Sequence, residues 1–200
     1  MRRHTITTAV VGLTAALTLA GCSSSEPADT QDTSNSASPG SAADFNQADV
    51  TYAQGMTMHH QQAVDMSDTV LDKDGLDPEV ARLARDIKDA QGPEIRTMEG
   101  WLEDWGHPMD HGGHGSASGD EGHMDGMVSA EDIRALERAD GATASRLFLD
   151  QMIEHHEGAV DMAKQHRKDG HNPEALQLSE DVITDQQAEI TEMRQMRKTL

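Results

Sequence analysis

Two adjacent histidine pairs, each in the same short frame, are the residues of this chain whose types and spacing could do chemistry. His59-His60 and His155-His156 lie in the stretches MHHQQAVDM and MIEHHEGAVDM, and both precede x-x-Ala-Val-Asp-Met. Imidazole nitrogens are common transition-metal ligands, and the methionine thioether is a soft ligand that favours Cu(I). Because the chain has only eleven histidines, the repeated doublet indicates a signature copied with the fold, a paired metal site, or both.

Local signals from Asp44 onward predict helices arranged as two hairpins. A capping box that begins at Asp44 predicts the start of the first helix, and Gly75 stands where a left-handed residue ends it. Two N-cap-Pro pairs, Asp77-Pro78 and Asn172-Pro173, predict the starts of later helices. We expect a hairpin over residues 44–105, a loop over 106–128, a short helix over 129–138 and a hairpin over 143–199, with the third long helix starting near Thr143.

The second hairpin repeats the first. In the first helix of each, Tyr52, Met56, His59, His60, Ala63, Val64, Asp65 and Met66 match Phe148, Met152, His155, His156, Ala159, Val160, Asp161 and Met162. In the second helix, Gln91, Glu94 and Met98 match Gln186, Glu189 and Met193. Two hairpins with one apolar stripe each bury those stripes against each other, so we predict an all-α four-helix bundle.

A helical wheel places both members of each histidine pair beside the apolar stripe, whereas Asp65 and Asp161 point outward. Gln-x-x-Glu pairs lie within the apolar arcs of the partner helices. Folding each hairpin at its turn sets residue 60 level with about residue 91, and residue 156 with about residue 186. The sequence therefore predicts one polar layer that crosses the bundle.

This layer has the composition of a metal site in a bundle core. We expect ligands among His59, His60, His155, His156, Met56, Met66, Met152 and Met162, and more loosely Met98 and Met193. Carboxylates and amides would orient the imidazoles by hydrogen bonds: Gln91, Glu94, Gln186 and Glu189. An accessory metal tract is expected in the loop: His107, Met109, His111, His114, His123, Met124 and Met127. The alternative is a structural layer of hydrogen-bonded core residues in an envelope sensor or adaptor.

The donor set favours copper, as Cu(I) or Cu(II), with another transition metal as the alternative. No Glu has a His three residues on, which counts against the Glu-x-x-His di-iron centre of some bundles. The sequence offers no phosphate-binding loop and no assembled Ser/His/Asp set. We therefore expect no catalysis, while a redox enzyme would require a metal with an open coordination position.

The N-terminal segment predicts export and lipid anchoring. Arg2-Arg3 followed by an apolar run predicts a signal peptide over residues 1–21, and Leu19-Ala20-Gly21-Cys22 resembles the bacterial lipobox, in which the cysteine is lipidated. The Ser/Ala/Asp/Pro-rich residues 22–43 would be a disordered tether to the bundle domain, 44–200. A net charge of −20 argues against a nucleic-acid partner. The expected partners are a metal ion and, through the lipid, the cell membrane; no protein partner is predicted.

The stretch LFLDQMIEHHEGAVDMA, residues 147–163, with its shorter echo over residues 52–67, resembles the secreted "domain of unknown function 305" family. The resemblance covers roughly residues 45–199. It implies a ferritin-like four-helix fold, and it implies copper binding through His and Met in metal tolerance or handling, because the family includes periplasmic copper-binding proteins. It carries over to the two histidine pairs and the methionines beside them. The first copy departs from the commoner apolar residues at Gly55 and Thr57.

Overall fold

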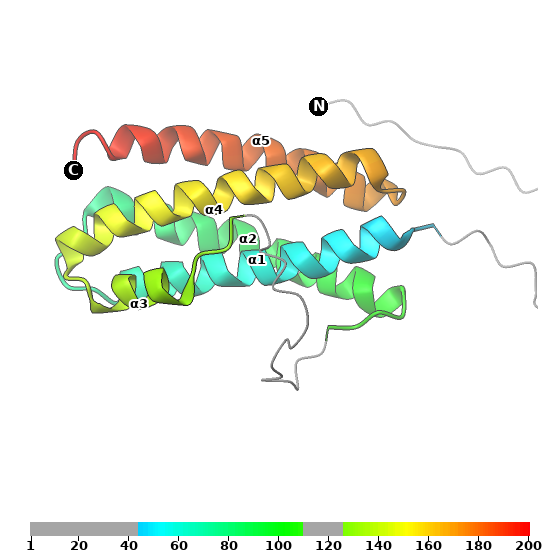
Figure 1. Ribbon diagram of the computed structural model, residues 1–200, viewed down its shortest axis with the longest axis horizontal. Helices are drawn as coiled ribbons and strands as arrows, with labels where there is room; N and C mark the ends of the chain where they lie inside the picture. The colour runs from blue at the N-terminus through cyan, green and yellow to red at the C-terminus, as the bar shows by residue number, and fades with distance from the viewer. Residues whose placement is uncertain (1–43, 110–125) are drawn as a thin grey trace, which may run out of the picture. The chain divides into compact units, whose positions relative to one another are not determined.

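The computed structural model of the chain describes residues 44–109 and 126–200 (Figure 1). These residues form five helices and no strand: α1 (Gln47–Leu71), α2 (Pro78–Asp104), α3 (Ala130–Arg138), α4 (Gly141–Asp169) and α5 (Pro173–Met196). The four long helices make the bundle, and α3 packs against α1 and α4. The predicted all-α bundle of two hairpins with a short extra helix is confirmed. The predicted signal peptide, Cys22 and the tether lie outside the described residues.

The helices follow the order of a ferritin-like bundle. α1 and α2 form one antiparallel hairpin, α4 and α5 form the other, and α1 packs beside α4. Figure 1 shows that α1 and α4 run in opposite directions, so α2 ends at one end of the bundle and α4 begins at the other, and one long connection joins them. One long crossover of this kind distinguishes ferritin-like bundles from bundles with short loops throughout.

Two helix starts differ from the sequence prediction. The capping box of α1 belongs to Asn46 and Asp49, not to Asp44, because the Asn46 side chain accepts from the N–H groups of Ala48 and Asp49 and the Asp49 carboxylate accepts from the Asn46 N–H. Helix α4 begins at Gly141 rather than near Thr143, since Asp140 caps it through the Thr143 N–H. Ser129 caps α3, the short helix that the sequence predicts over residues 129–138.

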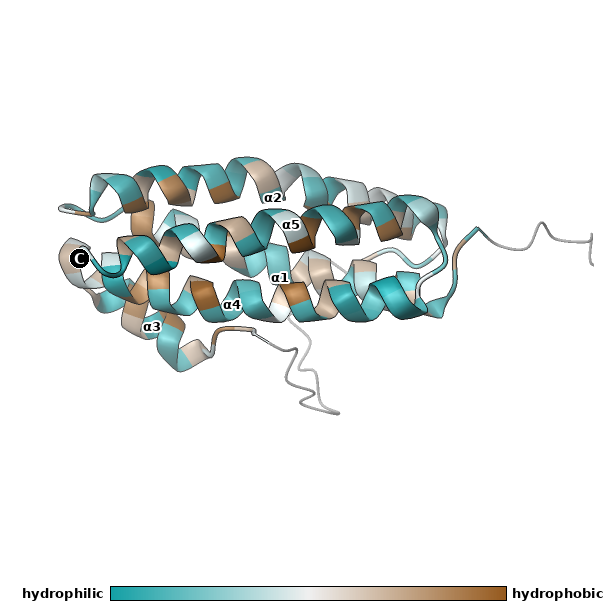
Figure 2. Cartoon of the chain, turned by 90° about the horizontal axis from the view of Figure 1, so that it is seen from above, coloured by the Kyte–Doolittle hydropathy of each residue, from teal (hydrophilic) through white to brown (hydrophobic). Residues whose placement is uncertain are grey.

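Apolar side chains fill the bundle in two clusters with the histidine pairs between them. In α1 and α4, one cluster contains Val50, Tyr52, Ala53, Met56, Ala159 and Ala163. The other contains Ala63, Met66, Val70, Ala144, Phe148, Leu149, Met152 and Val160. Figure 2 shows the hydrophobic positions recurring along α2 and α5 among hydrophilic ones, as in helices with one buried face.

None of the helices in residues 44–109 and 126–200 is both apolar enough and long enough to cross a membrane.

A buried carboxylate joins the start of α1 to the turn between α4 and α5. Asp49 accepts hydrogen bonds from the backbone N–H groups of His171 and Asn172, at 3.0 and 3.1 Å. Nε2 of His166 lies 2.8 Å from Asp49 Oδ1, and its Nδ1 lies 2.6 Å from Ser179 Oγ. Because Asp49 and His166 are both buried, these bonds satisfy groups that water cannot reach.

The hydrogen bonds keep Asp49 ionised. Burial raises the pKa of its carboxyl, but the hydrogen bonds, that from the Asn46 N–H foremost, outweigh burial and hold the pKa below its usual value. A carboxyl whose pKa is lowered by folding stabilises the fold above its unfolded pKa, and that contribution is lost as the pH falls through its folded pKa. Acid should therefore loosen this end of the bundle.

Gly170 ends α4, but its counterpart Gly75 does not end α1 as predicted, because α1 stops at Leu71 with Asp72 as its C-cap. Gly75 lies in the turn after α1 with φ of +75°, a left-handed conformation that favours glycine. Gly170 has φ of −70°, which any residue could adopt. A Cβ on Gly170 would lie 2.4 Å from Nε2 of His166. Glycine is therefore needed here to make room for the imidazole that Asp49 holds.

We expect Asp49→Ala to lower the free energy of unfolding by about 2–4 kcal/mol at neutral pH, because it leaves the buried His166 imidazole and two backbone N–H groups without their partner. Urea denaturation followed by circular dichroism measures this. Asp161→Ala is the control, since Asp161 is exposed and its loss should stay within about 0.5 kcal/mol. A loss below about 1 kcal/mol for Asp49→Ala would contradict the assignment.

Candidate metal centre

The centre of the bundle is a contact between two imidazoles. His59 of α1 and His155 of α4 have ring centroids 3.7 Å apart, with their planes inclined by 40°. Both residues are fully buried. Because α1 and α4 are equivalent helices of the two copies, the repeated doublet brings one member of each pair together across the bundle.

The surroundings of this contact keep His155 neutral. Burial lowers the pKa of the His155 imidazole well below its usual value, and the neighbouring His59, His156 and His60 lower it further. A neutral imidazole retains one nitrogen lone pair, which is the form that binds a metal.

The second member of each pair bonds to a carboxylate on its own hairpin. His60 Nε2 lies 2.7 Å from Glu94 Oε2, and His156 Nε2 lies 2.6 Å from Glu189 Oε2. The imidazoles are fully buried, whereas the carboxylate side chains are 23% and 21% exposed. Each pair thus runs from the interior to the surface.

Negative charge gathers on the α2–α5 side of the layer. Burial raises the pKa of Asp185, and the charges of Glu94, Asp181 and Glu189 raise it further. Glu94 and Glu189, the carboxylates that bond to the imidazoles, are therefore close enough to Asp185 to interact with it electrostatically. This side of the layer is acidic.

Several buried polar atoms of the layer lack a hydrogen-bond partner among the residues that the structure describes. Both amide atoms of Gln91, Oε1 of Gln186, and Nδ1 of His60 and of His156 are in this state. Gln91 and Gln186 are only 3% and 4% exposed. Such atoms are costly to bury without a partner, so they are typical of a site that holds a ligand or ordered water.

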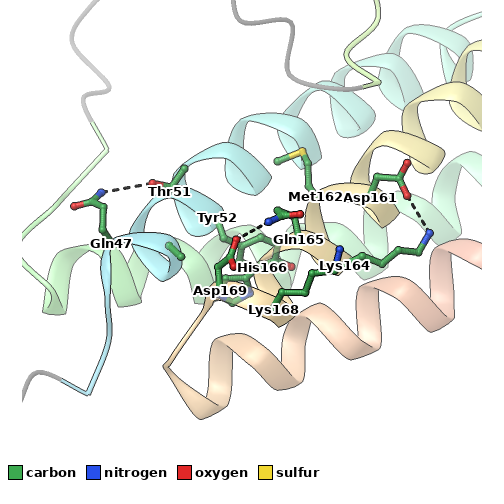
Figure 3. A pocket seen from close by; sticks show the side chains of 11 residues that line it. Gln47, Thr51, Tyr52, Asp161, Met162, Lys164, Gln165, His166, Lys168 and Asp169 are labelled. Carbon is green, nitrogen blue, oxygen red and sulfur yellow. Dashed lines mark hydrogen bonds and ion pairs between the residues drawn. The ribbon is translucent and has the colours of Figure 1, made fainter.

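Six methionines lie on the two sides of the layer: Met56, Met98 and Met162 with one apolar cluster, and Met66, Met152 and Met193 with the other. Five of them are buried. The exception is Met162, which is half-buried and lines a surface pocket of about 660 Å³ between the start of α1 and the end of α4 (Figure 3). The equivalent Met66 is buried, so the two copies differ here.

The predicted accessory tract is only partly described. His107 is exposed and lies edge-on to Phe45, while Met109 and Met127 are half-buried. The other four residues lie outside the described residues: His111, His114, His123 and Met124.

Within residues 44–109 and 126–200, no three side chains of His, Cys, Asp or Glu converge as in a ready-made cation site. Thioethers are the other donors that the core offers. The layer offers imidazole nitrogens, some of them without a partner, and a methionine thioether one turn before each doublet. Both are types of ligand that bind copper. The layer therefore has suitable ligands, brought close but not arranged around an ion.

Sequence reasoning passed over two residues that follow the doublets, Gln62 and Gly158. Gln62 hydrogen-bonds the backbone of Val128, and Gly126 lies against Gly158. Gln62 and Gly158 hold equivalent positions in the duplicated frame but differ in type. That divergence is the signal that could have singled them out.

Comparisons with known proteins identify the family. A family model described as "Domain of unknown function (DUF305)" matches residues 49–197, and the chain belongs to this family. A DUF305 fragment from Deinococcus radiodurans is 32% identical, with a TM-score of 0.68 over 78% of this chain and 98% of that chain. A DUF305 protein from Streptomyces coelicolor, described as secreted, is 34% identical, with a TM-score of 0.65 over 78% and 92%.

CopM has the same fold. Its Cu(I)-bound form is 34% identical, with a TM-score of 0.61 over 76% of this chain and 96% of that chain. CopM has also been solved in Cu(II)-bound and Ag-bound forms. No curated protein sequence matches the chain.

We expect Gln91→Leu to stabilise the metal-free protein by about 1–2 kcal/mol, because it removes two buried polar atoms that have no partner. Chemical denaturation in the presence of a chelator measures this. Gln187→Leu, at an exposed position of α5, is the control and should change stability by less than about 0.5 kcal/mol. Destabilisation by Gln91→Leu would show that the amide is hydrogen-bonded in solution.

Proposed function

We propose that this DUF305 protein binds copper in its histidine layer and buffers the metal, or confers resistance to it, outside the cytoplasm without catalysing a reaction. The observation that carries the proposal is the buried contact between His59 and His155, with a carboxylate-held imidazole beside each. A polar layer in an apolar core is costly unless its groups are partnered. A bound metal would supply that partner.

The carboxylates support the proposal by selecting a tautomer. A carboxylate accepts hydrogen bonds, so the bond between His60 and Glu94 has the imidazole Nε2–H as donor. In a neutral ring the lone pair then belongs to Nδ1, the atom that has no partner among the described residues. His156 and Glu189 repeat the arrangement. Histidines that ligate metals have their second nitrogen held in this way.

The donor types favour copper among the transition metals. Thioethers on both sides of the layer are soft ligands suited to Cu(I), and imidazoles suit either oxidation state. The chain lacks a thiol in residues 44–200, so oxidation to a disulfide cannot remove a ligand there. CopM, which is 34% identical, has been solved with Cu(I), Cu(II) and Ag bound, and these structures support copper as the metal here.

The setting that we propose is the outer side of the cell membrane. The lipobox-like residues 19–22 support a lipid anchor at Cys22. A relative described as secreted supports an extracytoplasmic location. The net charge of −20 would draw cations toward the domain. In this setting the protein would hold copper at the cell envelope.

We expect the full chain without its signal peptide to bind Cu(I) with defined stoichiometry. The double substitution His59→Ala and His155→Ala should weaken the core site at least about 100-fold, because two imidazole ligands are lost. Competition with a chromophoric Cu(I) chelator measures the affinity. His171→Ala, which removes an exposed imidazole, is the control and should bind as the wild type does.

Two outcomes would contradict this assignment. Absence of stoichiometric Cu(I) and Cu(II) binding would remove the proposed function. Unchanged stoichiometry after replacing all four core histidines, His59, His60, His155 and His156, would move the site to the loop.

We expect Glu94→Gln and Glu189→Gln each to weaken copper binding by about 10- to 100-fold, the usual effect of losing a carboxylate that orients a ligating histidine. The same chelator competition measures this. Glu103→Gln is the matched control, since it removes an exposed carboxylate from α2. Equal affinities for all three variants would show that the carboxylates serve the fold alone.

A further inference from the structure

The segment Gly126–Val128, here called the strap, is fixed to the seam between α1 and α4. The Gln62 side chain donates from Nε2 to Val128 O at 3.0 Å and accepts from the Val128 N–H at 2.8 Å. At the other end, Gly126 has φ of +85°, and a Cβ there would lie 2.7 Å from the Gly158 Cα. Both helices of the seam therefore hold the strap.

The attachment points place the strap over the paired imidazoles. Gln62 follows His59 by three residues, and Gly158 follows His155 by three residues. Residues three apart lie on the same side of a helix. The strap therefore crosses the seam on the outer side of the buried contact. The other side of the layer faces α2 and α5, where carboxylates hold His60 and His156.

The strap is attached by few interactions compared with the helices that it covers. Its two hydrogen bonds to Gln62 are only partly buried. Val128 packs against the apolar core, and Ser129 then begins α3. Short segments with few buried contacts open far more readily than packed helices. Lifting the strap is thus the least costly way to expose the imidazole contact from this side.

We propose that the strap controls access to His59 and His155, so that metal enters and leaves the layer along the α1–α4 seam. In this role Gln62 and Gly126 are positioning residues: they hold the strap closed and touch no metal. This route lies on the side of the layer opposite α2 and α5. Electrostatic attraction alone would instead lead a metal cation to the acidic α2–α5 side. The inference rests on the proposed copper site and adds the path by which the site exchanges its metal.

The first test is the rate at which the Cu(I)-loaded full chain, without its signal peptide, transfers Cu(I) to an excess of chromophoric chelator. Gln62→Ala should release metal about five- to thirty-fold faster, the factor expected for the loss of two partly exposed hydrogen bonds, with unchanged stoichiometry. Gln61→Ala is the matched control: Gln61 is the neighbouring residue, is exposed, and bonds within α1 to Asp65.

A second pair of variants separates strap contact from backbone strain. Gly126→Ala should also accelerate release, because its Cβ would meet the backbone of α4. Gly106→Ala is its control: Gly106 has φ of +76° and nothing within 4 Å of its Cβ position. The two substitutions impose the same left-handed strain, so only the contact with α4 differs. Gly106→Ala should release metal at the wild-type rate.

A third measurement needs no metal. Deuterium exchange at the imidazole C2 position of the metal-free protein should be faster at His59 and His155 in Gln62→Ala than in Gln61→Ala, and unchanged at His60 and His156.

Equal exchange and release in Gln62→Ala and its control would overturn the strap proposal while leaving copper binding intact. Release accelerated only by Glu94→Gln or Glu189→Gln would also overturn it, since metal would then pass the α2–α5 side. Failure of the wild type to bind Cu(I) would remove the proposed function, and the exchange measurement would still decide whether the strap covers the imidazoles.

Discussion

The rest of this bundle depends on four imidazoles placed where water cannot reach them. A buried imidazole is stable when it is neutral or when a carboxylate partners it, and the structure uses both solutions. His59 and His155 contact each other in the centre, and burial, followed by the neighbouring imidazoles, disfavours the charged form of His155. His60 and His156 reach carboxylates that remain in touch with solvent. The apolar clusters on either side then isolate this layer, so its polarity is confined to one level of the bundle.

The duplication imposes this layer twice but does not keep the two copies identical. Gly75 has a left-handed backbone in the turn after α1, whereas Gly170 makes room for His166 at the end of α4. Met66 is buried, whereas its copy Met162 lines a surface pocket. In these regions each copy has acquired its own neighbours. The doublets and their carboxylates have the same geometry in both halves, to within 0.1 Å in the bonds between imidazole and carboxylate.

Much of this arrangement was predictable from periodicity. Helix phase placed both histidines of each pair at the core, and equal rise in the two arms of a hairpin brought residue 60 within one turn of Glu94, its partner in the structure. Helical periodicity could not predict which imidazoles contact each other, because those contacts depend on how α1 packs against α4. Nothing in the periodicity singles out Asp49, because its burial arises from the α4–α5 turn that packs over it. The strap was beyond prediction for the same reason: its attachment uses side chains distant in sequence.

The antiparallel contact of α1 with α4 has a consequence for how such a site can arise. The two helices meet through equivalent residues, because His59 of one hairpin contacts His155, its counterpart in the other. A contact of this form is isologous, since one surface recognises a copy of itself. A single hairpin with one doublet would thus carry everything needed to build the layer as a dimer. Joining two hairpins in one chain makes assembly independent of protein concentration, and it frees each half to change alone, as Gln62 and Gly158 have done on the two sides of the same seam.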